Sequence, residues 1–222
     1  QGENTRQGDV AVPKGAIISG LTVGVLASNG VVQPAVTRKP RVTVIGTGSE
    51  LVAADQVPGP GQIRDSNRHV LMDMLRAAGA TVVDGGCVND SMAELVQAIR
   101  LGLESDVVVL SGGVSAGAYD LVTQALEGES LERLFHKVNM KPGKPLLVAK
   151  NDSKLVFGLP GNLVSTYVTA LLFLLPAIRI LVGHTPGPWS AWATLSQELS
   201  TTGTRTTFHP ARCRLLSNGT LE

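Results

Sequence analysis

The stretch from Asp106 to Leu110 most constrains the fold, because one acid is followed by an unbroken apolar run. Such runs are typical of parallel strands buried on both faces. The glycine- and serine-rich loop Ser111-Gly-Gly-Val-Ser115 follows, and a helical pattern then begins at Asp120. A loop between a strand and a helix exposes backbone N–H groups, which favour anion binding. An acid beside such a loop indicates a phosphate bound together with a divalent metal.

Strands alternate with helices through the middle of the chain, which predicts an α/β fold. We expect a three-layer, doubly wound, mostly parallel sheet that binds its ligand at the carboxyl ends of the strands. The expected strands are 41–46, 81–83, 106–110 and 131–138, followed by a hairpin of 146–149 and 155–157. The expected helices are 66–78, 91–103, 120–127 and a long apolar helix over 162–182. Ser91 and Glu94 have the spacing of a capping box at the second of these helices.

The two ends of the chain have a different character. Residues 1–40 indicate irregular or β-rich structure with one short helix over 19–29. Gly and Pro residues in 183–188 predict a linker. Short alternating runs beyond it predict the first part of a β-rich domain that is cut off at 222. We therefore expect the chain to be a fragment, with partial β-rich segments on both sides of an α/β domain over 41–183.

Composition excludes some classes of partner. The net charge of the 222 residues is +1 without a long basic block, which disfavours sequence-independent binding of nucleic acid. The apolar segment 163–179 is shorter than a bilayer span requires and predicts a buried helix, so no membrane is expected. Cys87 and Cys213 lack metal spacing, and we expect two free, buried thiols in a reducing, cytoplasmic compartment.

Acidic residues follow three of the predicted strands. Glu50 lies after the first strand beside Thr47, Asp90 after the second, and Asp120 after the third. Carboxylates gathered at one rim can hold a divalent metal through oxygen ligands. The alternative is that each acid only caps a helix or lies in a solvated loop.

Two lysines flank a tight turn in Lys141-Pro142-Gly143-Lys144. Pro fixes the backbone and Gly permits a sharp bend, so both ammonium groups can face one anion. The alternative is an ordinary solvated turn.

Two further helix starts offer polar groups. Pro160-Gly161-Asn162 opens the long helix, and its N–H groups can either bind a ligand or merely form a cap. Asp65-Ser66-Asn67-Arg68 opens an earlier helix, where Asp65 or Ser66 can be the cap and Asn67 and Arg68 can reach a ligand.

Together these segments resemble the molybdopterin molybdenumtransferase family, which includes bacterial MoeA, the E domain of gephyrin and the plant Cnx E domain. The resemblance rests on five motifs in the family's order: 47–51, 61–67, 111–115 with Asp120, 140–145 and 158–162. It implies a MogA/MoeA-like molybdopterin-binding domain over 41–183. Residues 1–40 then resemble the end of an N-terminal, dimerising region, and residues 184–222 the start of a C-terminal β domain.

The resemblance also implies a reaction and its residues. Members of this family cleave adenylylated molybdopterin with a divalent metal, release AMP and insert molybdate into the dithiolene. Asp120, Glu50, Asp90, Lys141 and Lys144 match the family's essential acids and lysines, with Glu50 and Asp120 expected to bind Mg²⁺. The pterin and its phosphates are expected to contact the residues of the matching loops: Ser111, Gly112, Gly113, Val114, Ser115, Thr47, Asp65, Ser66, Asn67, Pro142, Gly143, Pro160, Gly161 and Asn162. A homo-oligomer is implied, a dimer in the full-length family or a trimer for the isolated domain.

Three other functions fit parts of the pattern. A MogA-type molybdopterin adenylyltransferase shares the fold and the Gly-Gly loop. A non-enzymatic molybdopterin-binding scaffold is the second, and a competence-damage-type nucleotide hydrolase the third. The lysine turn and the trailing β segment favour the molybdenumtransferase.

Overall fold

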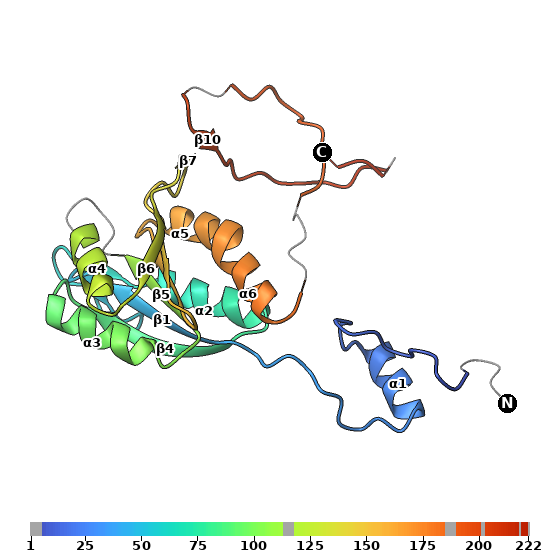
Figure 1. The fold of residues 1–222 in the computed structure, drawn as a ribbon. Helices are drawn as coiled ribbons and strands as arrows, with labels where there is room; N and C mark the ends of the chain where they lie inside the picture. Colours follow the sequence, from blue (N-terminus) through green and yellow to red (C-terminus); the bar gives the residue numbers. More distant parts are fainter. Residues whose placement is uncertain (1–5, 113–117, 185–189, 201–202, 218, 222) are drawn as a thin grey trace.

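The computed structural model describes residues 6–112, 118–184, 190–200, 203–217 and 219–221, with only the backbone of 118–120. Its centre is a six-stranded sheet in the order β4-β1-β5-β9-β8-β6 (Figure 1). The strands are β1 (Arg41–Thr47), β4 (Thr81–Val88), β5 (Val107–Gly112), β6 (Glu132–His136), β8 (Leu147–Lys150) and β9 (Leu155–Leu159). β4, β1, β5 and β9 are parallel, whereas β8 and β6 are antiparallel. This arrangement confirms the predicted α/β fold with a mostly parallel sheet.

Helices cover both faces of the sheet (Figure 1). On one face lie α2 (Asn67–Ala77) and a continuous helix made of α5 (Leu163–Thr169), a π-helical turn (Ala170–Leu174) and α6 (Leu175–Leu181). On the other face lie α3 (Met92–Gly102) and α4 (Ala118–Glu127). Each face of the sheet has its own apolar core. Val107 and Val109 of β5 lie in the core on the α2 side, whereas Val108 and Leu110 lie in the core on the α3 side. This alternation explains why the strand is apolar throughout.

The long apolar helix contains one wide turn that the sequence pattern does not reveal. The N–H of Leu175 donates to the carbonyl of Ala170, five residues back. Pro176 follows immediately, and a proline inside a regular helix lacks an N–H and clashes with the preceding turn. The wide turn absorbs this defect while Ala170, Leu174 and Ile178 stay fully buried.

By length and composition, this helix is also the single candidate membrane span among the described residues, with a mean hydropathy of 1.8 over Leu163–Leu181. That is weak support for a span, because core helices share both properties. Its inner face packs against the sheet and α2, but only 33% of the apolar window is buried, so the buried helix predicted from the sequence is found on one face only.

Short elements surround the sheet. β2 (Leu51–Val52) pairs with β3 (Ile63–Arg64), and β7 (Met140–Lys141) pairs with β10 (Thr206–Thr207). Two-residue strands carry no hydropathy period, so sequence reasoning missed all four. In the N-terminal segment, α1 (Gly20–Ser28) is capped by Ser19 and has no buried residue; it stands apart from the sheet (Figure 1).

Three local expectations were wrong. Ser91 makes no side-chain cap bond, and Glu94 instead accepts from the N–H and side-chain amide of Asn89, so no capping box forms. The strand expected to end at residue 83 continues to Val88. Cys87 and Cys213 are free but exposed, because Cys87 lies on an edge strand and Cys213 in a segment without a core.

Asp106 joins the starts of three strands. Its carboxylate accepts from both terminal nitrogens of Arg38, at 2.7 and 2.9 Å, and from the N–H of Arg41 at 2.7 Å. Its carbonyl accepts from the N–H of Leu155. The hydrogen bond from Arg38 is the main cause that lowers the pKa of Asp106 to about 2, and the Arg41 N–H adds to it.

We expect Asp106→Asn to lower the free energy of unfolding at pH 7 by about 1 kcal/mol, since the pair is partly exposed. Because the carboxyl pKa is lower in the folded state, this stabilisation is present above about pH 4 and disappears as the pH falls to about 2. Urea denaturation of both proteins between pH 2 and 7 measures it. Asp152→Asn, at an exposed hairpin position, is the control; an equal loss in both variants contradicts the role of Asp106.

Candidate functional site

The predicted site motifs converge at one rim of the sheet. Thr47, at the end of β1, pairs with Gly112 of β5 and with Val88 of β4. Ser111 pairs with Leu159 at the end of β9. The loops after these four parallel strands therefore begin at the same edge. Since β8 is antiparallel, the segment that carries the lysine turn enters the sheet at this edge as well.

The backbone is packed very closely at the centre of this rim. Gly112 has a φ of +96°, and a Cβ added there would lie 2.3 Å from the carbonyl oxygen of Thr47. A Cβ on Gly161 would lie 3.4 Å from the Cα of Gly112. Only glycine fits at position 112, both for its conformation and for its space. The ends of β1 and β5 and the loop after β9 therefore lie in close backbone contact.

Two buried hydroxyls at this rim have no hydrogen-bond partner within the described part of the chain. Thr47 is 3% exposed and Ser111 is 1% exposed. Strand alternation places Ser111 on the α2 side with Val109, and Thr47 on the α3 side with Ile45. A buried hydroxyl without a partner costs free energy, which makes both groups candidates for hydrogen bonds to a ligand.

The loops that carry Glu50 and Asp90 are joined to each other. The N–H of Asp90 donates to the Ser49 hydroxyl at 3.0 Å, and the N–H of Ser49 approaches the Asp90 carboxylate at 3.4 Å. The Glu50 carboxylate lies over Gly48, where an added Cβ would be 2.6 Å from its nearer oxygen. Both acids are exposed and free to meet a ligand from solvent.

The structure describes only part of the glycine- and serine-rich loop over 111–115. Gly113, Val114 and Ser115 lie outside the described residues, as does the side chain of Asp120. The backbone of Asp120 lies in the first turn of α4. Within the described part of the chain, no three His, Cys, Asp or Glu residues gather in a metal-binding group.

The lysine turn is fixed against α5. The Lys141–Pro142 peptide bond is cis, and Gly143 has a φ of +97°. A Cβ on Gly143 would lie 2.5 Å from Cγ2 of Thr169, so glycine allows the turn to touch the helix. Lys141 and Lys144 remain exposed. The N–H of Phe208, just after β10, donates to the carbonyl of Lys141 at 2.8 Å.

The segment 65–68 differs from its prediction. Asp65 is 2% exposed, and its carboxylate accepts from the N–H and Nε of Arg68 and from the Cys87 thiol. It therefore caps α2, which is one of the two roles considered for it from the sequence, and it is also paired with Arg68 and Cys87. Arg68 is buried and paired as well, so it is not free to reach a ligand. Ser66 is exposed and makes no side-chain cap bond.

Asn67 and Asn162 connect the helix starts. The Asn67 side-chain amide donates to the carbonyl of Gly161 at 2.7 Å, which ties α2 to the loop after β9. The Asn162 side-chain oxygen accepts from the N–H groups of Val164 and Ser165. Asn162 is thus a helix cap, and the Pro160 carbonyl accepts from the Thr166 hydroxyl.

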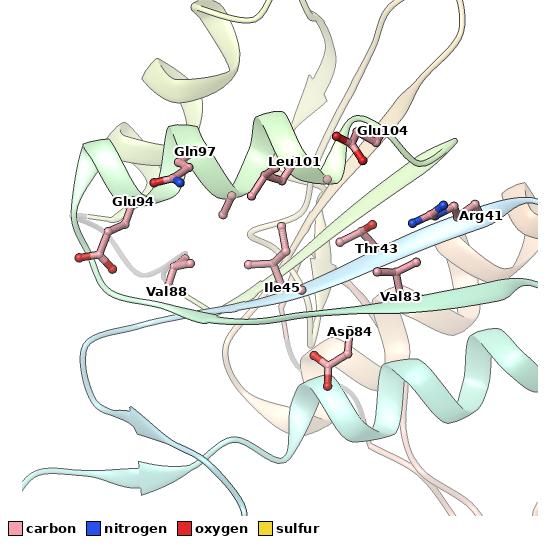
Figure 2. Close-up of a pocket in the computed structure, with 13 residues that line it drawn as sticks. Arg41, Thr43, Ile45, Val83, Asp84, Val88, Glu94, Gln97, Leu101 and Glu104 are labelled. Atoms are coloured by element: carbon pink, nitrogen blue, oxygen red, sulfur yellow. The ribbon is translucent and has the colours of Figure 1, made fainter.

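A cavity of about 440 Å³ lies between α3 and the strands β1 and β4, and its lining extends to Val88 at the end of β4. Figure 2 shows Ile45, Val88 and Leu101 among its lining residues. It arises where α3 leaves part of the edge strand uncovered. None of the residues predicted from sequence to form the site lines it, and no sequence pattern indicated it.

The rim as a whole can bind an anion. It combines two unpartnered hydroxyls, two exposed lysines and a glycine-rich strand end with the exposed acids Glu50 and Asp90. Lysines and hydroxyls suit phosphate or another oxyanion, and the acids suit a hard cation beside it. Fold and rim thus define an α/β domain whose candidate ligand site lies at the carboxyl ends of the parallel strands.

The particular family follows from comparison with known proteins. Residues 43–180 match the model of the probable molybdopterin binding domain, and the chain belongs to this family. A molybdopterin molybdenumtransferase of Staphylococcus aureus strain Mu50 is 34% identical over 221 residues, which cover 99% of this chain and 53% of that protein. The chain therefore spans about half the length of the curated relatives that it matches.

Solved structures agree with this assignment. The MoeA molybdopterin biosynthesis protein from Pyrococcus horikoshii superposes with a TM-score of 0.69 at 33% identity, over 78% of this chain and 43% of that one. The CinA protein from Thermoplasma acidophilum, with a TM-score of 0.51 at 20% identity over 61% of this chain and 96% of that one, shares only the fold.

We expect Gly112→Ala to destabilise the protein by about 2–4 kcal/mol, because the new methyl group meets the Thr47 carbonyl and the backbone is left-handed. Thermal unfolding measures the loss. Gly128→Ala is the control, since its Cβ would lie 3.6 Å from its nearest neighbour. Equal stability of the two variants contradicts the close packing of the rim.

Proposed function

We propose that this chain is the substrate-binding part of a molybdopterin molybdenumtransferase, which releases AMP from adenylylated molybdopterin and inserts molybdate into the dithiolene. The single observation that supports this most is that the buried hydroxyls of Thr47 and Ser111 at the rim have no partner among the residues the structure describes. The names of the relatives point to the same chemistry. The reaction needs a site that accepts a phosphoanhydride and an oxyanion together, and the rim has groups for both.

Each set of rim residues has a role in this proposal. Thr47, Ser111 and the 113–115 loop hold the phosphates of the adenylylated substrate. Lys141 and Lys144 attract molybdate and the developing negative charge of the leaving phosphate. Ser66, Asn67, Pro142, Gly143, Pro160 and Gly161 form the surrounding walls that orient the pterin, and such orientation lowers the barrier.

Mg²⁺ is part of this proposal. Glu50 and Asp120 would hold it, with Asp90 nearby, because carboxylate oxygens are the ligands that Mg²⁺ prefers. Mg²⁺ commonly uses one or two carboxylates together with substrate phosphates, so this donor set fits. When bound, it would neutralise phosphate charge and polarise the bond to be cleaved.

The flanking segments belong to neighbouring domains in this proposal: 1–40 to a dimerising region and 184–222 to a C-terminal β domain. The full protein is then a cytoplasmic homo-oligomer, dimeric or, for the isolated domain, trimeric. The β7–β10 pairing supports a contribution from the C-terminal domain, because it places Thr206 and Thr207 beside the lysine turn.

A test of the function uses calorimetric titration of the 222-residue chain with adenylylated molybdopterin in Mg²⁺, followed by molybdate-dependent AMP release. We expect Lys144→Ala to weaken molybdate-dependent release at least about 10-fold, since one charge-assisted contact is lost. Lys150→Ala removes the same charge at the far end of β8 and should match the wild type.

ATP-dependent adenylylation of molybdopterin would instead favour the adenylyltransferase, and protein partners without pterin or metal affinity would favour the scaffold.

A second test separates ligand binding from stability. Ser111→Ala removes a buried hydroxyl without a partner, so the free protein should be as stable as the wild type or slightly more stable. Substrate binding should weaken by about 10-fold, because the ligand loses a hydrogen bond in a dry site. Thermal unfolding and titration measure both quantities. A large loss of stability with unchanged affinity contradicts a ligand role for Ser111.

A further inference from the structure

A network of charged side chains surrounds the buried Arg68 at the start of α2. Arg68, at the second position of α2, has a side chain that is only 9% exposed and is hydrogen-bonded to Asp65 and to Asp84 of β4. Nε of Arg68 lies 2.7 Å from Asp65. The pKa of the guanidinium is raised despite burial, because both carboxylates hydrogen-bond to it. A buried arginine bridging two acids from different elements fixes those elements relative to each other.

A bulge in β4 makes this network possible. β1 and β4 shift register between Val44 and Gly46, so Asp84 pairs with Val44 but Cys87 pairs with Gly46. In a regular strand, residues three apart point to opposite faces, whereas an extra residue brings both to one face. A Cβ on Gly85 would lie 2.6 Å from Ile45, so Gly85 is required there. Figure 2 shows Asp84 on the side of β4 that faces α2, away from α3.

The network also reaches the centre of the rim. The Asp65 carboxylate accepts from the Cys87 thiol at 3.1 Å, and a Cβ on Gly46 would lie 2.9 Å from Oδ2 of Asp65. Gly46 pairs with Ser111, whose hydroxyl has no partner among the described residues. Although Cys87 as a whole residue is exposed, partial desolvation of its thiol and the neighbouring Asp65 carboxylate raise the thiol pKa to about 11, so the thiol stays protonated as a donor.

Asn67 precedes Arg68 in α2 and links this helix to the loop after β9, on the other side of the rim from β4. Its side-chain amide donates to Gly161, which touches Gly112, while Arg68 holds β4. The first turn of α2 therefore spans the rim from the edge strand to the loop after β9. Movement of Arg68 would shift Asn67 and the Gly161–Asn162 loop with it.

We propose that Arg68, held by Asp65 and Asp84, is a positioning residue that acts through Asn67 to keep the Gly161 loop in its ligand-binding arrangement. The consequence for ligand binding rests on the proposed function. Arg68 itself touches none of the exposed rim groups that would meet the ligand. Its contribution is to fix the position of α2 between β4 and the Gly161 loop, which form two sides of the proposed site.

A double-mutant cycle of Asp84→Asn and Asn67→Ala tests this. The Asp84 side chain is 49% exposed, so its substitution should leave the fold intact, and Arg68 keeps Asp65. We expect Asn67→Ala to weaken binding of AMP in Mg²⁺ by about 10-fold and Asp84→Asn by about 3-fold, with the double variant no weaker than Asn67→Ala alone. Asp73→Asn, an exposed acid on the same helix, should have no effect.

Hydrogen exchange of the peptide 160–166 provides a readout that needs no ligand. Asp84→Asn should accelerate exchange at the Val164 and Ser165 amides, and adding Asn67→Ala should cause no further acceleration. Arg68→Lys, which keeps the charge but loses the fork that joins both acids, should behave like Asp84→Asn.

The outcomes are distinct. The positioning role of Arg68 is overturned if the double variant binds AMP more weakly than Asn67→Ala alone, by the product of the two single effects. It is also overturned if Asp84→Asn leaves the amide exchange of 160–166 unchanged. If the wild type does not bind AMP but exchange is coupled as expected, the proposed function fails at this ligand and the positioning of the loop stands. Coupling in both measurements supports both.

Discussion

The close contact of Gly112 with Thr47 and Gly161 is the constraint on which the site depends. Four parallel strands end at the same edge, and Gly112 allows the end of β5 to lie directly against the backbone of Thr47. Any side chain at position 112 would separate β5 from the end of β1. The same contact brings the unpartnered hydroxyls of Thr47 and Ser111 to neighbouring strand ends on opposite faces of the sheet. Within the described ranges of the chain these two hydroxyls have no partner, and hydrogen bonds from a ligand would offset the cost of their burial.

The contacts that stabilise the sheet and the residues that form the candidate site lie at opposite ends of the parallel strands. Asp106 joins the strand starts through Arg38, Arg41 and Leu155, far along the strands from the rim. The rim carries glycines, a helix cap and exposed charges instead. Such a division lets the site keep groups that do not stabilise the free protein, since the two apolar cores and the opposite edge hold the sheet together.

Sequence reasoning identified the parallel strands whose ends form the rim, because the signals for those strands are local. The apolar run of β5 and the glycine loop after it identify a strand end, and parallel strands share one edge. It failed where a side chain's partner comes from a distant element. Asp65 and Arg68 look like free polar groups at a helix start, but the bulge in β4 supplies Asp84 and Cys87 to pair with them. Glu94 likewise reached Asn89 rather than Ser91, since the loop before α3 lies within its reach.

The sequence alone determined the alternation of elements, the buried central strands and the order of the motifs, because hydropathy period and glycine placement act within a few residues. Only the tertiary structure decided which polar groups stay open to a ligand and which are paired. That choice depends on contacts between residues far apart in the chain, such as Asn67 with Gly161 and β7 with β10. Pairing of this kind has no period in sequence, and it follows from how the layers and loops pack.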